Sequence, residues 1–184
     1  MWTQLVSLRA LRLAVVLGMS LVAGCSASAS GGPLDQGNDS GALCAPVASD
    51  GSITVGIETL VNSARESAVI DSVGLADARG LSIIESRVVV FEGASDTGST
   101  LIGVRSGYPP HDRKEWTQSP LASGFEIPPE AVTNDVVNLV LGLRMDADAD
   151  RATASAIEVR YAVGRARYTY FTTNSIELLR GPCR

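Results

Sequence analysis

The feature that most constrains the fold is an alternation of apolar and other residues over residues 136–145. If this segment is extended, one set of apolar side chains points one way: Val137, Leu139, Leu141, Leu143 and Met145. Asn138, Gly142 and Arg144 point the other way. A period of two is typical of a β-strand, because successive side chains of a strand point to opposite faces of the sheet. The segment therefore predicts a strand with one face in a hydrophobic core.

The same period recurs from Ile53 onward and predicts further strands. They cover residues 53–62, 68–75, 81–91, 101–104, 157–163, 167–173 and 175–179. Segment 81–91 is expected to bend near Glu85–Arg87, and 157–173 reads as a hairpin. No segment has a helical stripe, and Pro and Gly fall between the strands. This pattern predicts an all-β, immunoglobulin-like β-sandwich of about 7–8 strands, with a small β-barrel as the alternative.

The N-terminus has the pattern of a secretory signal. Arg9 and Arg12 precede a short apolar run, Leu13–Leu21, which ends at Val22-Ala23-Gly24-Cys25. A positive start, an apolar centre and a small-residue cleavage site define such a signal. A transmembrane helix is the alternative, but it needs about 20 apolar residues, and the two arginines leave a run that is too short.

With a cysteine directly after the cleavage site, this N-terminus resembles that of bacterial lipoproteins. The resemblance implies a lipobox at Leu21–Gly24, cleavage before Cys25 and a diacylglyceryl group on the Cys25 thiol. Two acyl chains anchor a protein stably where one does not. We therefore expect a signal peptide over residues 1–24, a flexible tether over 25–43 and the β-sandwich domain over 44–184. The expected location is extracytoplasmic, at a membrane that the protein contacts through its Cys25 lipid anchor.

The remaining cysteines fit this location. The chain has three, Cys25, Cys44 and Cys183. If Cys25 carries the lipid, the other two bracket the folded part, and an even pair outside the cytoplasm usually forms a disulfide. Two free thiols are the alternative.

The charge of the chain bears on its partners. Of 15 basic and 20 acidic residues, Arg9 and Arg12 leave with the signal, so the mature chain has a net charge of −7. An acidic domain of this kind argues against nucleic acid and against anionic lipid as partners.

Two short motifs resemble functional sites but lack residues that those sites require. Asp96-Thr97-Gly98-Ser99 matches the aspartic-protease triplet, but it occurs once, within residues of loop composition. Asp146, Asp148 and Asp150 have the spacing that opens an EF-hand loop, but Arg151 and Ile157 stand where that loop needs Gly and Glu. These aspartates are at most weak candidates for a loose Ca²⁺ site.

The chain also lacks the other common signatures of catalysis and cofactor binding. His111 is the only histidine, which is too few for an ordinary transition-metal site. The nucleophile turn and the glycine-rich nucleotide-binding loops are absent. We expect no catalytic residues, no cofactor and no enzymatic activity.

The segment Gly107–Trp116 is the candidate binding loop. It carries Tyr108, His111, Arg113 and Trp116. Loops on a rigid scaffold often hold binding residues, with Tyr, Trp and Arg as the usual anchors. The alternative is that the aromatic side chains belong to the core. We expect Trp116 to be packed and Tyr108 to be exposed.

Residues 53–179 also resemble a class of envelope proteins from actinobacteria. The resemblance rests on the opening strand, Gly107–Pro110, Asn138–Leu143 and the Tyr-rich terminal hairpin, and it implies no activity. The function expected is a non-catalytic binding or structural module of the cell envelope, with an envelope protein as a possible partner. A small-ligand or metal-ion carrier is the first alternative, and an enzyme is the second.

Overall fold

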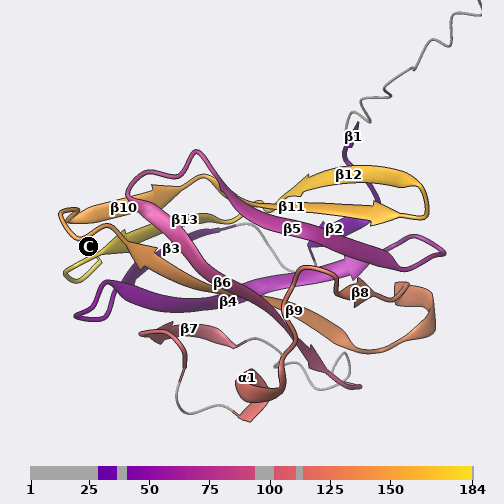
Figure 1. Ribbon diagram of the computed structural model, residues 1–184, viewed down its shortest axis with the longest axis horizontal. Helices are drawn as coiled ribbons and strands as arrows, with labels where there is room; N and C mark the ends of the chain where they lie inside the picture. The colour runs from indigo at the N-terminus through magenta and orange to yellow at the C-terminus, as the bar shows by residue number, and fades with distance from the viewer. Residues whose placement is uncertain (1–28, 37–40, 94–101, 111–113, 184) are drawn as a thin grey trace, which may run out of the picture.

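The chain folds into a β-sandwich of two layers, and a short helix with its neighbouring segments covers part of one outer face. The computed structural model describes residues 29–36, 41–93, 102–110 and 114–183, and its layers are shown in Figure 1. One layer is a five-stranded sheet. Its order is β1 (Ala29–Ser30), β12 (Ala166–Phe171), β11 (Ala156–Val163), β5 (Ala68–Ala76) and β8 (Glu126–Ile127).

The facing layer is a second sheet, here called the central sheet. Its order is β2 (Leu34–Gln36), β4 (Ser52–Asn62), β9 (Val136–Met145) and β6 (Leu81–Phe91), and β7 (Gly103–Ser106) pairs with the other half of the β4 edge. A small sheet of β10 (Arg151–Ala154), β13 (Ser175–Leu179) and β3 (Ala42–Pro46) extends the first layer. The predicted all-β sandwich is confirmed, since none of these sheets closes into a barrel.

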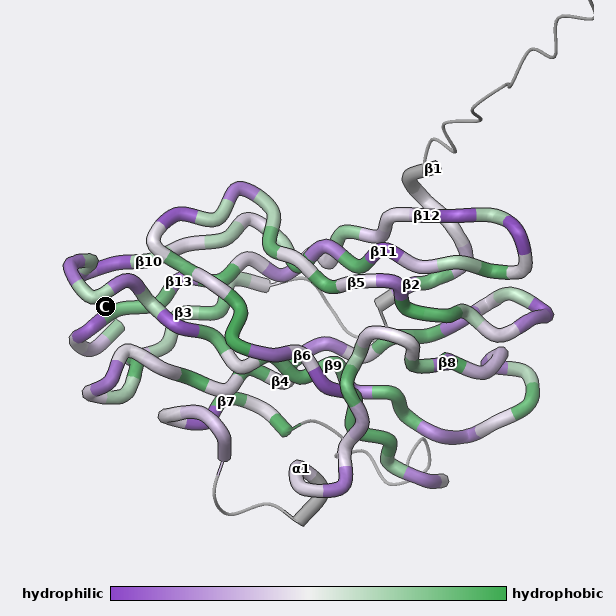
Figure 2. Tube along the Cα trace, viewed as in Figure 1, coloured by the Kyte–Doolittle hydropathy of each residue, from purple (hydrophilic) through white to green (hydrophobic). Residues whose placement is uncertain are grey.

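The core lies between the two layers. It is made of aliphatic side chains from both sheets, among them Ile53, Leu139, Leu141, Ile157 and Val159, each at most 1% exposed. Figure 2 shows the hydrophobic stretches along these strands and the hydrophilic ones mostly in the connections. The alternation over residues 136–145 therefore predicted both a strand and its buried face correctly.

A bulge in β4 changes which residues reach the core. The pairing of β4 with β9 shifts register between Val55 and Glu58. A strict period of two from Ile53 would put Val61 on the face of Ile53 and Val55, but Leu60 is the core residue, 3% exposed, and Val61 is only partly buried. The predicted bend of 81–91 is confirmed by a register shift between Ile83 and Glu85.

The tether is shorter than predicted. Residues 34–36 form β2 along β4, and β3 begins at Ala42. Leu34 is 3% exposed, and its backbone N–H donates to the hydroxyl of buried Tyr161 at 3.0 Å. One leucine and backbone pairing thus dock a segment whose small polar composition suggested a flexible coil.

Four other elements differ from the expectation. Residues 151–154 form β10, in which Ala152 and Ala154 alternate and point into the core. Alanine side chains are small, so this alternation is not conspicuous in the sequence. The strand expected at 101–104 is β7, Gly103–Ser106. Two short helices were not expected, α1 (Lys114–Gln118) and the 3-10 helix η2 (Glu130–Val132).

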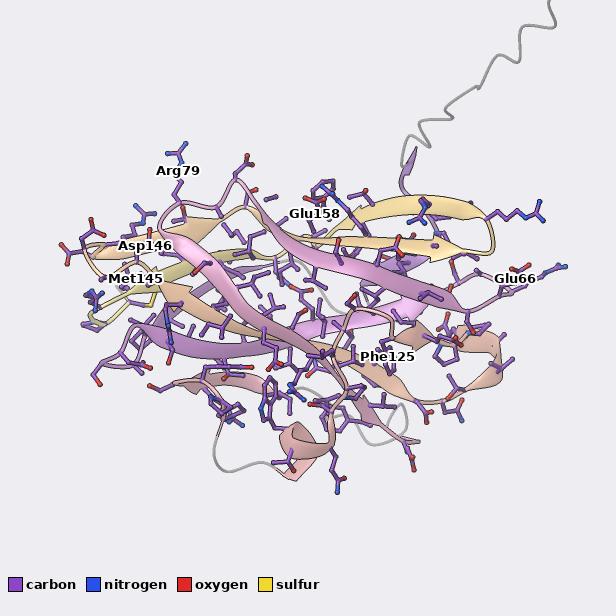
Figure 3. The ribbon with its side chains drawn as sticks, in the orientation of Figure 1. Glu66, Arg79, Phe125, Met145, Asp146 and Glu158 are labelled. Atoms are coloured by element: carbon purple, nitrogen blue, oxygen red, sulfur yellow. A yellow bond between two sulfur atoms is a disulfide. The ribbon has the colours of Figure 1, made fainter. Side chains whose placement is uncertain are left out.

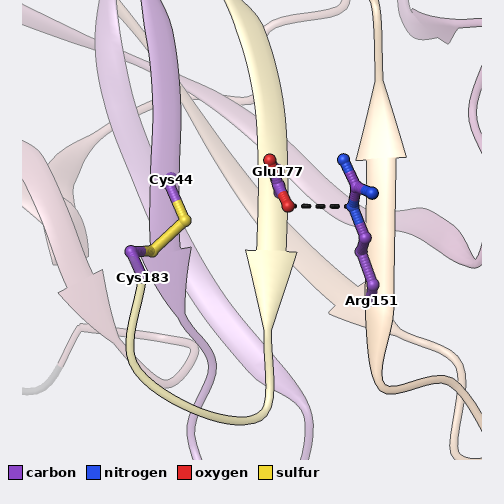
Figure 4. The surroundings of a disulfide bond; sticks show 4 residues. All are labelled: Cys44, Arg151, Glu177 and Cys183. Carbon is purple, nitrogen blue, oxygen red and sulfur yellow. Dashed lines mark ion pairs between the residues drawn. A yellow bond between two sulfur atoms is a disulfide. The ribbon is translucent and has the colours of Figure 1, made fainter.

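The predicted disulfide is confirmed. Cys44 in β3 is bonded to Cys183, with the Cα atoms 6.0 Å apart, within the usual range. Figure 4 shows this bond beside the ion pair of Arg151 and Glu177, 2.8 Å between Nε and Oε1, which links β10 to β13. The bond joins residues 139 apart in sequence, so it ties the two ends of the domain together.

Candidate functional site

The predicted binding loop covers the outer face of the central sheet. In Figure 1, α1 lies on the side of β4, β9 and β6 away from β11 and β5. Ile102 and Trp116 pack there against Val89 and Val140. Tyr108 and Phe91 contact the same group, which is here called the outer cluster. Because this cluster covers the second face of β9, the strand is buried on both sides.

A glycine makes the close approach of Tyr108 possible. A Cβ atom built on Gly142 would lie 2.2 Å from carbon atoms of the Tyr108 ring, closer than real Cβ contacts. Thr54, on the neighbouring strand, donates its hydroxyl to the Gly107 carbonyl oxygen at 2.8 Å. The contact of the Tyr108 ring with Gly142 and the hydrogen bond from Thr54 therefore hold this part of the loop against the sheet.

The polar part of the outer cluster is a set of mutually paired groups. Arg87 donates from Nε and Nη2 to the two Glu85 carboxylate oxygens, each at 3.0 Å. Its Nη1 donates to the Ser119 carbonyl oxygen at 2.6 Å, and its guanidinium carbon lies 5.4 Å from the centre of the Trp116 ring. The Tyr108 hydroxyl donates to Glu85, and the Tyr108 ring meets Trp116 edge-on at 5.5 Å.

These contacts fix the protonation states of the cluster. The Arg87 hydrogen bonds, and then the Tyr108 hydroxyl, lower the pKa of Glu85. Burial, and then the Glu85 hydrogen bond, raise the pKa of Tyr108 to about 12. A charged carboxylate, a charged guanidinium and a neutral phenol therefore satisfy one another, which is the pattern of a structural network.

The predicted loop residues meet different outcomes. Trp116 is packed as expected, with 6% of its surface exposed. Tyr108 was expected to be exposed, and that expectation is wrong, because its ring lies on Gly142 and is only partly exposed. His111 and Arg113 lie outside the described residues, as does the Asp96–Ser99 triplet.

The aspartates of the acidic loop are exposed, and an arginine binds the backbone of this loop. Asp146, Asp148 and Asp150 are all exposed, and Asp146 lies just beyond Met145 at the end of β9 (Figure 3). Arg180 occupies the loop carbonyls: its Nε donates to Ala149 at 2.9 Å, and its Nη2 donates to Asp146 at 3.1 Å and to Ala147 at 2.9 Å.

The Arg180 guanidinium thus takes up three backbone carbonyl oxygens of this loop and brings a positive charge to it, which disfavours a second cation there. In the described part of the chain, no group of three or more His, Cys, Asp or Glu side chains could hold a metal ion. These three aspartates, weak candidates from their spacing, are a polar connection between β9 and β10.

One buried carboxyl was missed by the sequence reasoning. Glu58 is 1% exposed. It pairs with Leu139 across the β4–β9 ladder, and paired residues share a face, so its side chain points into the core. Its Oε1 accepts a hydrogen bond from Asn174 at 2.9 Å, and its Oε2 has no hydrogen-bond partner among the described residues. Burial raises the pKa of this carboxyl, although the Asn174 hydrogen bond lowers it.

Comparison with known proteins adds no relative. No family model, no curated protein and no solved structure matches the chain. In the described residues no helix has the length and apolar character needed to cross a membrane.

Proposed function

We propose that this protein is a lipid-anchored component of the bacterial cell envelope whose β-sandwich is a non-catalytic binding or structural module. Residues 1–24 are the signal peptide in this proposal, and Cys25 carries the diacylglyceryl anchor. The sandwich stands outside the cytoplasm, close to the membrane and attached to it by the first residues of the mature chain.

The observation that carries the proposal is the Cys44–Cys183 disulfide. Disulfides persist in oxidising compartments outside the cytoplasm and are rare inside it. If Cys25 carries the lipid, two cysteines remain. These two are bonded to each other, with Cα atoms 6.0 Å apart. All three cysteines then have a role that agrees with one location, as expected if the N-terminal pattern is a lipoprotein signal.

Two features of the sandwich support a non-catalytic role. The ionisable groups that the fold brings together, Glu85, Arg87 and Tyr108, bond to one another. The acidic loop is occupied by Arg180. The metal-carrier alternative has no support from side chains, because Met145, the methionine of the folded domain, is 2% exposed.

Lipidation is tested by expressing the full-length chain in a bacterium fed with labelled palmitate. The wild type is expected to carry label and to partition into a detergent phase. Cys25→Ala is expected to lose the label and to remain an uncut precursor, whereas the matched control Ser26→Ala is expected to keep it. Label that persists on Cys25→Ala would overturn the anchoring proposal.

The envelope role is tested separately by cross-linking in intact cells. A partner of the anchored protein is expected to be enriched with the wild type and lost when residues 1–25 are replaced by a cleavable secretory signal without the cysteine, because that protein is released from the membrane surface. An enzymatic role would instead require a reaction that the purified wild type accelerates. Such an activity, abolished by a change in the sandwich that leaves its melting temperature intact, would contradict the non-catalytic proposal.

A further inference from the structure

One end of the sandwich has a cleft that its own side chains do not fill. It lies where β4 ends and β9 begins, beneath the segment that leads from β8 to β9, and it has a volume of about 340 Å³. This segment forms the right-hand end of the molecule in Figure 1. The volume is at the lower end of the range for small-molecule sites, roughly 300–1,000 Å³.

The floor of the cleft is the hydrophobic core itself. Leu60, Ile127 and Val137 line it, and they are 3%, 1% and 4% exposed. All three belong to the core between the sheets. A molecule in the cleft would therefore lie over this aliphatic floor and contact the partly exposed Pro128 and Val136 beside it, where burial of apolar surface is favourable.

The rim of the cleft is acidic. Glu130 and Asp135 line it, together with the exposed Asn134. The hydrogen bond with Thr133, and then the one from the Gly93 backbone N–H, lower the pKa of Asp135. Among the described residues, those that line the cleft include no lysine or arginine. The rim thus has two carboxylates without a cation beside them in the lining.

Both the floor and the Asp135 side of the rim are held by hydrogen bonds before any ligand binds. Asn62 donates from Nδ2 to the Ile127 carbonyl oxygen at 3.0 Å and to that of Glu66 at 2.9 Å. The Gly93 backbone N–H donates to Asp135 Oδ1 at 3.0 Å. A cleft fixed in this way loses little conformational entropy on binding.

We propose that this cleft binds a small cationic amphiphile, a molecule with a compact apolar body and a protonated amine. The apolar body lies on the aliphatic floor, and the ammonium group lies between the Glu130 and Asp135 carboxylates. Opposite charges at the rim and burial at the floor act together, so the amine is preferred over a neutral or an anionic molecule of the same shape. The inference concerns a site that the lipid anchor does not form, so it stands or falls independently of the proposed anchoring.

The test uses full-length protein in lipid nanodiscs, with empty nanodiscs as the blank. Three probes of matched shape are compared by saturation-transfer NMR at millimolar concentration: benzylammonium, benzyl alcohol and benzoate. Benzylammonium is expected to bind, benzyl alcohol to bind more weakly, and benzoate to give no signal above the blank. The preference for the amine is expected to shrink at high salt, because salt screens exposed charges.

Variants locate the binding. Glu130→Gln and Asp135→Asn are each expected to weaken benzylammonium about two- to fivefold, the size of an exposed ion pair, and to leave benzyl alcohol unchanged. Asn134→Trp places a large ring at the entrance from an exposed position and is expected to abolish binding of both. Glu126→Gln, an exposed carboxylate on β8 outside the lining, is the matched control and is expected to bind like the wild type.

Melting temperatures show that each variant is folded before its binding is compared. Benzoate that binds as well as benzylammonium would overturn the proposal, as would an Asn134→Trp variant that is folded and still binds. Failure of all three probes to bind the wild type would overturn it as well. None of these outcomes bears on the palmitate label, which tests the anchor alone.

Discussion

The two faces of the central sheet each carry a glutamate, half-buried on the outer face and buried on the inner face, and the surroundings shift the two pKa values in opposite directions. On the outer face, Glu85 lies between the Arg87 guanidinium and the Tyr108 hydroxyl, and its pKa is lowered. On the inner face, Glu58 has one amide donor and one oxygen without a partner among the described residues, and its pKa is raised.

The two carboxyls differ both in burial and in the donors beside them. A carboxylate with a cation and donors beside it stays ionised, whereas one with little compensation favours the neutral form. The outer face is therefore a polar network that holds a layer of chain in place. The inner face is an apolar core that contains the carboxyl group of Glu58.

The largest expected effect comes from removing the centre of the outer cluster. Trp116→Ala is expected to cost about 3–5 kcal/mol, as for other buried large aromatic side chains. In a domain of this size the melting temperature falls by on the order of ten degrees. Circular-dichroism melts measure it, with Leu121→Ala as the control, because Leu121 is 53% exposed and should shift the melting temperature little. Equal melts for the two variants would mean that the outer cluster is not packed.

The next effect tests the contact between Tyr108 and the sheet. Gly142→Ala puts a Cβ atom 2.2 Å from the ring, so either the ring or the strand must move, at a cost of about 1–3 kcal/mol. Gly74→Ala is the matched control on β5, because its Cβ would meet only the Glu158 Cβ, at 3.9 Å.

The double variant Gly142→Ala with Tyr108→Ala separates the steric effect from a general loss of strand stability. It is expected to be less destabilised than the sum of the single changes, because the clash is gone. Strict additivity would contradict the close approach.

The inner carboxyl is tested by Glu58→Gln as a function of pH. A raised pKa in the folded state means that Glu58 stabilises the fold fully only below its ordinary value of 4.5, and that this contribution is lost as the pH rises through the folded value. The variant cannot ionise, so it is expected to gain on the order of 1 kcal/mol relative to the wild type in alkaline buffer and nothing in acid. Denaturant titrations at several pH values measure the difference, and Glu126→Gln is the exposed control. A variant less stable than the wild type at high pH would show that the charged form of Glu58 is the stabilising one.

The smallest expected effect comes from Tyr108→Phe, which removes one hydroxyl and keeps the ring. The lost hydrogen bond to Glu85 is expected to cost about 0.5–1.5 kcal/mol. Because Arg87 is the first cause of the lowered Glu85 pKa and Tyr108 the second, this pKa should rise and still lie below its ordinary value. Carbon-13 NMR of the side-chain carboxyl groups measures it, and an unchanged Glu85 pKa would remove Tyr108 from the network.

The sequence predicted the strands better than the surfaces. Residues 136–145 and 175–179 match β9 and β13 residue for residue, because large aliphatic side chains at period two leave little choice of conformation. The cysteine count led to the disulfide for a similar reason, since few pairings were possible.

What the sequence could not predict depends on contacts between distant segments. Tyr108 looked like an exposed anchor because its partners, Glu85 and Gly142, lie on two other strands. A strict period of two from Ile53 would put Glu58 on the face opposite Ile53 and Val55, because nothing in the local pattern marks the bulge between Val55 and Glu58. The cleft was missed because its floor consists of ordinary core residues.

The two faces of one sheet thus hold glutamates of opposite character: Glu85 is paired with a cation, and Glu58 has a single amide donor. A pH titration of the side-chain carboxyl carbons of both residues by NMR, with each signal assigned from Glu58→Gln and Glu85→Gln, measures this difference. We expect Glu58 to titrate above the ordinary value of 4.5 and Glu85 below it. A Glu58 signal that titrates below that of Glu85 would show that the two faces do not differ in this way.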